Sequence, residues 1–592
     1  RTLVPMRHLL LAFALGCAPT VPRSTGSGTD APAGDGAHPA DHDSGTPETG
    51  DGGDSDGDDG IDDVGGSALQ LDHAGGWVDD GGFALTVTTA LVGATVLTTR
   101  DGSDPLRSPT ATPYTAPLDI DRTTVVRLAL TTDGTPVGPT VTRTFVFPDQ
   151  VATQAAPDDW PTQWSPDYGT GGWSTPHYGL SDEITEDDPA GFQAALRALP
   201  MLSLVLDPGD LWGPTGLYDH AWESGTAWER PLSLELYADG EEEFAINAGG
   251  RIYGGASRQP DRSPKKSIRV LFKSDYGPGT LRYPLYEDAG PEQFDGLVLR
   301  AGYNHSWVHW DPTQRSRAQL LRDPYARATQ RALGGEAPRG RHVHLFLNGL
   351  YWGIYDIAER ADADFFADRA GGGEWDVLNS GEAIDGDTDD WDETLRRAQE
   401  ADGSDASLDA LREKVDEGAL IDYMLMNLWA GNDDWPWHNW YAGRQRSDDG
   451  RWRFVSWDAE HTLKELGTDR TGADDVGTPG QVFQAFALHG AFRDRLAARA
   501  AEVMGDGGVL SPAIAIARYD ALADILGPAM LAESARWGSY RRDVYCYASA
   551  PCELYTVDDH WTPERDRITD AYLPARTAVV QDQLAARGWW PE

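Results

Sequence analysis

The chain has 592 residues with 95 acidic and 49 basic side chains, which gives a formal net charge of −46. This charge disfavours binding to nucleic acid and docking on anionic lipid, so any phosphate is expected to arrive with a cation. Hydrophobic residues make up 40% of the chain and 22 residues are tryptophan, which is ample for buried cores. The sequence therefore predicts a mostly folded protein of several domains.

Residues 1–17 are typical of an export signal. From Met6 the sequence MRHLLLAFALGC has a basic start, an apolar run too short to span a bilayer, and a small residue before Cys17. It resembles a bacterial lipoprotein signal, in which this cysteine carries lipid, although Ala14 stands where leucine is most common. An ordinary secretory signal is the alternative. We expect an extracytoplasmic protein that is secreted or held to the cell envelope by lipid alone.

Two further cysteines support export. Besides Cys17 the chain has only Cys546 and Cys552, and their spacing in CYASAPC can close a small disulfide loop. A metal site is not favoured there, because two thiols with no nearby histidine do not complete a tetrahedral set. We predict a disulfide between them.

Residues 18–66 almost lack aliphatic and aromatic side chains, so they cannot bury enough surface to fold. We predict a disordered acidic linker. Its aspartates do not fit a calcium loop, because Gly65 occupies the position where an EF-hand needs a glutamate. A solvated spacer is therefore favoured over a metal site.

Residues 67–150 predict a small β-sandwich, because short Thr/Val/Leu alternations are separated by turn signals. The stretch LTTRDGSDP, followed by YTAPLDI and TTVVRLAL, resembles the immunoglobulin-like module of chitobiases and of many secreted bacterial surface proteins. We expect a spacer rather than a sugar-binding module, since no aromatic platform is evident. Residues 151–200, rich in Pro, Trp and Gly, are expected to form a connector.

The remainder, residues 201–592, predicts an α+β domain. Strands such as PLSLELYA, KSIRVLFK and HVHLFLNGLYWGIYDI come first, and helices such as RSRAQLLRDPYARATQRALG and ALIDYMLMNLWA dominate later. We predict a β-rich lobe over about 201–360 and a mainly helical C-terminal lobe over about 361–592. Within them we expect a helix over 314–333 and a hairpin over 341–357.

Basic residues gather between Arg251 and Lys273, in a chain that has only five lysines. Glycines precede a strand whose alternation sends Lys266 to one face and Lys265 to the other. Backbone N–H groups of a glycine-rich turn, with a lysine on the next strand, are what a phosphate tail needs. The segment therefore predicts a phosphate-binding loop, with a solvated basic loop as the alternative.

A second set of polar residues follows the helix ALIDYMLMNLWA. GNDDWPWHNWY places Asp434 five residues before Asn439, and RWRFVSWDAEH puts Asp458 at the end of a short strand. Protein kinases use this arrangement: the first Asp accepts a proton from the attacking hydroxyl, and the Asn and second Asp hold magnesium. Neither HRD nor DFG is literally present. The structural alternative is that Asp458 merely caps the helix after it.

Several separated motifs resemble the CotH kinase family, named for the spore coat protein H. The resemblance runs from about Leu199 to the C-terminus and includes AGGRIYGGASRQPDRSPKKSIRVLF, FDGLVLRAGYNHS with LLRDPYARA, VHLFLNGLYWGIYDIAER, and the N-x-D…N-W-Y and W-D sets. The family is similar to the protein-kinase-like fold. The resemblance therefore implies transfer of phosphate from ATP, with Mg²⁺ or Mn²⁺, to Ser or Thr of a surface or secreted protein.

The resemblance also implies roles in the chemistry. Asp434 would be the general base, and it is preferred to Asp433 because only Asp434 has the five-residue spacing to Asn439. Asn439 and Asp458 would be the metal ligands.

For the nucleotide, the resemblance implies that Lys266 holds the phosphates, with Lys265 and Arg251 as further candidates. Glu359, just after the predicted hairpin, would meet adenine or ribose. The glutamate that usually pairs with the phosphate-binding lysine is missing from the predicted helix 314–333, where Asp323 is the only acid.

The leading hypothesis is therefore an exported, membrane-anchored atypical protein kinase that uses Mg-ATP. One alternative is a non-catalytic surface lipoprotein whose kinase-like scaffold binds cell-envelope or extracellular polymer. Another keeps the nucleotide site but transfers a nucleotidyl group. The acceptor protein is not visible in the sequence.

Overall fold

The computed structural model describes residues 68–591 except 80, 159, 164–174, 260, 287–289 and 547–551. The predicted export signal, with Cys17, and the predicted acidic linker lie outside the described residues. Within the described residues, no helix has the length and apolar character needed to cross a membrane.

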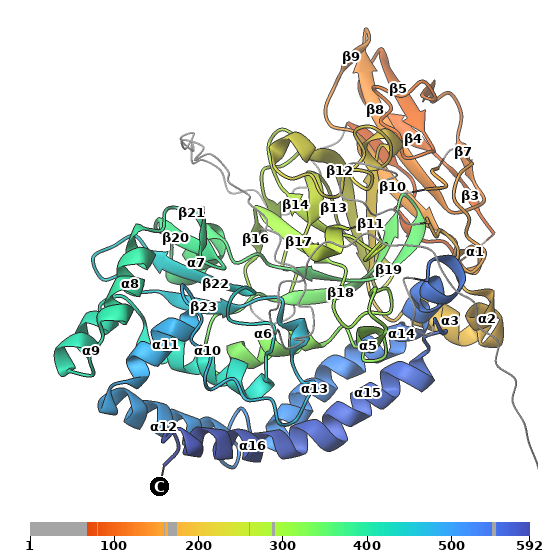
Figure 1. Cartoon of the computed structure of the whole chain (residues 1–592). Helices are drawn as coiled ribbons and strands as arrows, with labels where there is room; N and C mark the ends of the chain where they lie inside the picture. Colours follow the sequence, from red (N-terminus) through yellow and green to blue (C-terminus); the bar gives the residue numbers. More distant parts are fainter. Residues whose placement is uncertain are drawn as a thin grey trace, which may run out of the picture. The chain divides into compact units, whose positions relative to one another are not determined.

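The N-terminal part, drawn in red and orange in Figure 1, consists of short strands. One sheet has the order β2–β10–β8–β5–β6, with β9 paired to β8, and two small sheets pair β1 with β4 and β3 with β7. The strands are β1 (Leu69–Leu71), β2 (Gly76–Trp77), β3 (Phe83–Leu85), β4 (Val87–Thr89), β5 (Ala94–Thr99), β6 (Thr112–Pro113), β7 (Leu118–Ile120), β8 (Thr124–Thr132), β9 (Thr135–Pro136) and β10 (Val141–Val146). Apolar side chains from these strands share one core. The region is built of sheets, and its likeness to an immunoglobulin-like module stays a prediction.

The stretch expected to be a connector carries helices where it is described. These are α2 (Asp182–Asp187) and α3 (Pro189–Leu196), while α1 (Pro148–Val151) lies at the border with the preceding module. The side chain of Asp188 caps α3 by accepting a hydrogen bond from the backbone N–H of Gly191 at 2.8 Å. Phe192 and Leu196 of α3 are buried in a core shared with Met201 and Phe346.

The β-rich lobe is a closed barrel in the order β11–β12–β13–β14–β17–β19–β18 (Figure 1). Its strands are β11 (Met201–Leu206), β12 (Arg230–Ala238), β13 (Glu241–Tyr253), β14 (Ser267–Leu271), β17 (Gly296–Arg300), β18 (Gly340–Leu347) and β19 (Leu350–Ala358). Two short strands, β15 (Leu281–Arg282) and β16 (Gln293–Phe294), pair outside it, and α4 (Pro208–Leu211) follows β11. β11 runs parallel to β18, and the other barrel pairs are antiparallel. Alternate leucines of β11 and β12 fill the interior, as the period of a strand requires.

The hairpin predicted over 341–357 is confirmed as β18 and β19. It turns at Asn348 and Gly349, whose φ angles are 46° and 85°. Positive φ at both central residues is the requirement of a tight hairpin turn, and Asn-Gly meets it at low cost.

The helix expected over 314–333 is wrong in its extent. The structure has α5 (Pro312–Arg315) and α6 (Arg322–Ala332), and between them Leu320 has a φ of 61°. A leucine in this left-handed region cannot continue a helix. Because of the break, Arg322 and Asp323 lie in the first turn of a new helix.

The C-terminal part is mainly helical, as predicted, but it also contains an antiparallel sheet in the order β21–β20–β22–β23. The strands are β20 (Trp375–Asn379), β21 (Glu382–Asp385), β22 (Trp440–Gln445) and β23 (Arg453–Ser456). The helices are α7 (Ala363–Ala370), α8 (Asp389–Glu400), α9 (Asp405–Arg412), α10 (Glu417–Ala430), α11 (Pro479–Ala487), α12 (Gly490–Met504), α13 (Pro512–Leu526), α14 (Met530–Glu533), α15 (Thr562–Asp566) and α16 (Leu573–Ala586). Nearly every side chain of α10 is buried, so this helix is the centre of the largest core. The predicted disulfide between Cys546 and Cys552 is present.

Candidate active site

The loop between α10 and β22 carries Asp434 and Asn439. α10 ends at Ala430, and both Gly431, the next residue, and Asn439 have left-handed backbones with φ of 62° and 67°. The side-chain amide of Asn439 donates to the Oδ2 and to the backbone oxygen of Asp434, both at 3.1 Å. On the other side, Nε2 of His438 lies 2.9 Å from Oδ1 of Asp434. The loop is therefore closed on itself through one carboxylate.

Asp434 is held in its ionised form. Burial on its own raises the pKa of this carboxyl group, but the hydrogen bond and charge of His438, with His461 and Asn439, bring the pKa below its ordinary value. The side chain is still 29% exposed. A partly exposed carboxylate in a fixed orientation can accept a proton from a hydroxyl group.

Asp433 has different partners. Nζ of Lys464 lies 2.9 Å from its Oδ2, and Nδ1 of His461 lies 3.7 Å from its Oδ1. Lys464 also contacts Nδ1 of His461 at 2.9 Å. Asp433 is thus part of an ion pair, whereas Asp434 is the carboxylate bonded to Asn439.

Sheet register brings Asp458 to the same place. β22 and β23 are antiparallel, and Trp440 pairs with Ser456. Asn439 directly precedes Trp440, and Asp458 follows Ser456 by two residues, so both lie at one end of this sheet. Two backbone hydrogen bonds also join the segment after Asp458 to this region: Asp433 donates to His461 at 3.3 Å, and Leu463 donates to Ala430, the last residue of α10, at 2.9 Å.

Asp458 is bound by an arginine from the barrel. Nη2 of Arg300, the last residue of β17, donates to Oδ1 of Asp458 at 2.6 Å. The same guanidinium lies 3.4 Å from Glu460 and 3.5 Å from Asp323, and it stacks on the ring of Trp457 with 4.5 Å between the Arg carbon and the ring centre. Three carboxylates therefore converge on one buried cation, and Asp458, 38% exposed, is the most accessible of them.

Glu460 faces a small cavity beside this cluster. Its Oε2 accepts a hydrogen bond from the backbone N–H of Asn304 at 2.8 Å. Burial and the charge of Asp458 raise the pKa of Glu460 to about 8, against the charge of Arg300. The cavity lining includes Arg300, His305, Arg322, Asp323, His342 and Glu460.

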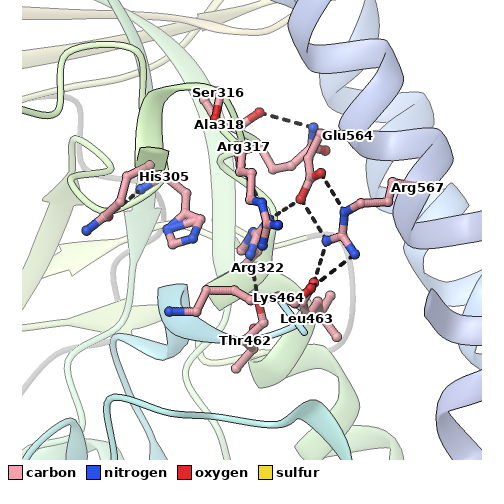
Figure 2. Close-up of polar contacts among 12 residues, drawn as sticks. His305, Ser316, Arg317, Ala318, Arg322, Thr462, Leu463, Lys464, Glu564 and Arg567 are labelled. Carbon is pink, nitrogen blue, oxygen red and sulfur yellow. Dashed lines mark hydrogen bonds and ion pairs between the residues drawn. The ribbon is translucent and has the colours of Figure 1, made fainter. Parts of the chain in front are cut away.

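Figure 2 shows how the C-terminal helices hold the loop after η3 (Ala459–His461). Glu564 of α15 pairs with Arg322, and it also accepts hydrogen bonds from Arg567 at 2.7 and 2.8 Å. Arg322 donates to the backbone oxygen of Thr462 at 2.7 Å. Arg567 donates to the backbone oxygens of Leu463 and Lys464 at 2.6 and 3.2 Å. One glutamate thereby orients the two arginines that fix this loop.

The structure gives the two lysines of the basic segment other partners. Nζ of Lys266 donates to the backbone oxygens of residues 257–259 at 2.9, 3.0 and 3.1 Å. Burial lowers the pKa of Lys266 to about 7. Nζ of Lys265 lies 2.8 Å from Glu533 and donates to the backbone oxygen of Ile354 at 2.5 Å. Glu533 of α14 thus pairs with Lys265, whereas Lys266, for which a glutamate partner was expected, donates to backbone oxygens.

The two other predicted nucleotide residues have contacts of their own. The carboxylate of Glu359 contacts Arg369 at 2.8 Å and accepts a hydrogen bond from the backbone N–H of Arg339 at 2.7 Å. Arg251 lines a pocket together with Arg258, Arg269 and Arg360.

The donor set at the end of the sheet fits magnesium. Within the described ranges, no group of three or more His, Cys, Asp or Glu side chains is arranged to hold a metal ion. Mg²⁺, however, commonly takes one or two protein carboxylates and completes its shell with water and phosphate oxygens. The carboxylate of Asp458 and the amide oxygen of Asn439 are donors of this hard kind, so they suit a magnesium ion that arrives with a nucleotide.

Three residues of this site were not predicted from the sequence. Arg300 ends an apolar strand in FDGLVLRAGYNHS, and a charged residue in that position is a usable signal. Glu460 follows Asp458 by two residues in WDAEH. Glu564 has no local signal, because its partner Arg322 lies 242 residues away in the chain.

A family model described as CotH kinase protein matches residues 252–570, which is more than half of the chain. The match contains Asp434, Asn439, Asp458, Arg300 and Glu564. No curated protein matches the chain.

Proposed function

The chain belongs to the CotH kinase protein family, and from this premise we propose that it is an exported protein kinase that transfers phosphate from Mg-ATP to Ser or Thr of a surface or secreted protein. The observation that carries the proposal is the meeting of Asp434, Asn439 and Asp458 at one end of the sheet β21–β20–β22–β23. This is the set that phosphoryl transfer needs: a base for the attacking hydroxyl and oxygen ligands for the metal.

Each side chain has a distinct task. Asp434 accepts the proton of the acceptor hydroxyl, and Asn439 and His438 hold its carboxylate in place. Asp458 and Asn439 would hold magnesium. Bound together, magnesium and ATP supply the transferable phosphoryl group and neutralise its charge. Arg300 fixes the orientation of Asp458.

We propose a divergent kinase-like fold for the matched region. The barrel strands, α6, the β18–β19 hairpin, the Asp434 loop and Asp458 follow one another in the order of a kinase. The lysine contacts depart from that plan. Those of Lys266 favour support of the 257–259 loop, and those of Lys265 favour an internal ion pair with Glu533.

A non-catalytic scaffold that binds envelope or extracellular polymer is the second candidate. It is favoured by the ion pair between Arg300 and Asp458, because the guanidinium already compensates the charge of the carboxylate. In that case the site would be a structural relic of a kinase.

Labelled ATP separates these functions. The purified full chain is incubated with magnesium, candidate acceptor proteins, and ATP labelled at either the γ or the α phosphate. Transfer of the γ label that is lost in Asp434→Asn supports the kinase. Transfer of the α label indicates nucleotidyl transfer, and transfer of neither label supports the scaffold.

We also propose export with a lipid on Cys17. The sequence of residues 6–17 and the Cys546–Cys552 disulfide support this location, because disulfides persist in oxidising compartments. In cells, Cys17→Ala should move the protein from the membrane fraction to the soluble fraction. Unchanged partitioning of the variant would remove the lipid anchor from the proposal.

A further inference from the structure

Guanidinium groups gather in a pocket at one end of the barrel. Its lining includes Arg251, Arg258, Arg269, Arg360, Tyr253 and Asn379. These arginines come from β13, η2 (Ala256–Arg258), β14 and the segment after β19. In a chain with 95 acidic and 49 basic residues, such a concentration of positive charge calls for a physical reason.

The barrel places two of these arginines face to face. Arg251 of β13 pairs with Arg269 of β14 in the antiparallel ladder, and like charges directly opposite each other are destabilising. Arg258 lies in the 257–259 loop, whose backbone oxygens Lys266 holds, and donates to the backbone oxygen of Ile252 at 3.0 Å. Hydrogen bonds within the fold therefore hold these positive charges close together.

Acidic groups also lie close to these arginines. Nη1 of Arg360 lies 3.5 Å from Asp362. Burial and the charge of Asp362 raise the pKa of Asp385 above its ordinary value, although the charges of Arg360 and Arg269 act to lower it, so this carboxyl group lies within electrostatic reach of the pocket arginines. The same guanidinium groups would also attract an anion in the pocket. Guanidinium suits phosphate in particular, because its planar fork donates two parallel hydrogen bonds to phosphate oxygens.

The pocket lies beside the candidate active site. The hydroxyl groups of Tyr253, in the pocket lining, and Tyr441 lie 3.0 Å apart. Both rings pack against Trp457, with centroid distances of 6.4 and 5.6 Å, and Trp457 is the residue before Asp458. Asn379, also in the lining, pairs with Tyr441 at the end of the sheet where Asp458 lies.

We propose that this arginine pocket binds phosphate groups. In the kinase these are the phosphates of the nucleotide, an identification that rests on the proposed function. Phosphate recognition then belongs to the guanidinium groups of Arg251, Arg269 and Arg360. Lys266 contributes by shaping the loop that carries Arg258.

The test measures binding without catalysis. Calorimetry on the full chain, in EDTA, follows the binding of inorganic pyrophosphate and of ATP. We expect both to bind, and Arg269→Gln to weaken both by roughly 10-fold or more, as expected for loss of a charge-assisted hydrogen bond. The matched control is Arg396→Gln, which removes a half-exposed arginine of α8 and should leave binding unchanged.

A second variant guards against misfolding. Arg360→Lys keeps the charge and removes the fork, so it should bind pyrophosphate more weakly than the wild type while keeping the thermal midpoint. The proposed phosphate binding is overturned if the wild type does not bind pyrophosphate, or if the wild type, Arg269→Gln and Arg360→Lys bind it equally well. If pyrophosphate binding depends on the arginines but no phosphotransfer occurs, the phosphate-binding pocket is supported and the proposed kinase function is overturned. If phosphotransfer occurs and pyrophosphate binding does not depend on the arginines, the kinase function is supported and the pocket is overturned.

Discussion

Arg300 donates a hydrogen bond to Asp458 at 2.6 Å, although the two residues are 158 positions apart in the chain. The same guanidinium reaches Glu460 and Asp323. One side chain at the end of a barrel strand thus sets the position of the most exposed carboxylate of this cluster.

Replacing this arginine by lysine tests whether its geometry matters. Arg300→Lys keeps the charge but replaces the wide planar fork by one compact ammonium group, so we expect it to lose at least one of the contacts to Asp458, Glu460 and Asp323. We expect the magnesium concentration for half-maximal phosphotransfer to rise by roughly 10-fold, the effect of losing about one charged hydrogen bond. Arg317→Lys, at a more exposed ion pair, is the control. An unchanged magnesium dependence would show that Arg300 does not position Asp458.

Substitutions of Asp458 and of Asp434 should have different effects on nucleotide binding and on rate. Asp458→Ala removes a metal ligand, so it should lose both Mg-ATP affinity and activity. Asp434→Ala should bind Mg-ATP nearly as the wild type does, yet lose roughly 10²–10⁴-fold in rate, the usual contribution of a positioned base. Calorimetry and phosphotransfer rates on the same preparations separate the two effects. Equal loss of nucleotide affinity in both variants would contradict these roles.

Glu564 should stabilise the folded protein, because its carboxylate pairs with Arg322, which holds the 462–464 loop near the active site. Glu564→Gln leaves buried Arg322 without its carboxylate, which we expect to cost about 3 kcal/mol in the free energy of unfolding. Urea unfolding measures this cost. Glu465→Gln removes a carboxylate that is 70% exposed and should cost less than about 1 kcal/mol. If the two substitutions cost the same, the buried cluster does not act as described.

His305 should make the protein sensitive to acid. Burial, with the charges of Arg322, His461, Lys464 and His309, lowers the pKa of His305 well below 6.5. Its stabilising contribution is therefore full above pH 6.5 and is lost as the pH falls toward the lowered pKa in the folded state.

The substitution His305→Asn checks this effect, because asparagine tolerates the φ of 52° at this position. The wild-type urea midpoint should drop between pH 7.5 and pH 5, and the variant should drop less. The drop should be reduced and not abolished, since burial also lowers the pKa of His309 and His461. Identical drops in the two proteins would exclude His305 as a source.

Local patterns predicted those parts of the fold in which neighbours in sequence are neighbours in space. The β18–β19 hairpin follows from alternation and an Asn-Gly turn, and α10 follows from its long apolar run. The helix over 314–333 was predicted too long, because tertiary packing holds Leu320 at a positive φ that nothing in its neighbourhood indicates.

The site shows the same division. Asp434 and Asn439 were predicted as site residues from their spacing, since they share one loop, and Asp458 was predicted from its place after a strand. Partners that arrive from distant segments were not found: Glu533 lies 268 residues from Lys265. Strand alternation predicts on which face of the strand a lysine lies, but it does not predict which carbonyl or carboxylate group the lysine contacts there.

The closure of the barrel sets the limits for truncation. β11 and β12 lie before residue 252, where the family match begins, and β11 joins β12 to β18. A fragment that starts at 252 would lose β11, β12 and nearly all of β13, and would leave the edges of β14 and β18 unpaired, which invites aggregation. At the other border, Arg576 of α16 lies beyond residue 570 and donates to the backbone oxygens of Leu428 and Trp429 at 2.7 and 2.8 Å. Expression trials that trim to the matched region should therefore yield insoluble protein, whereas borders before Leu199 and after Trp589 should not.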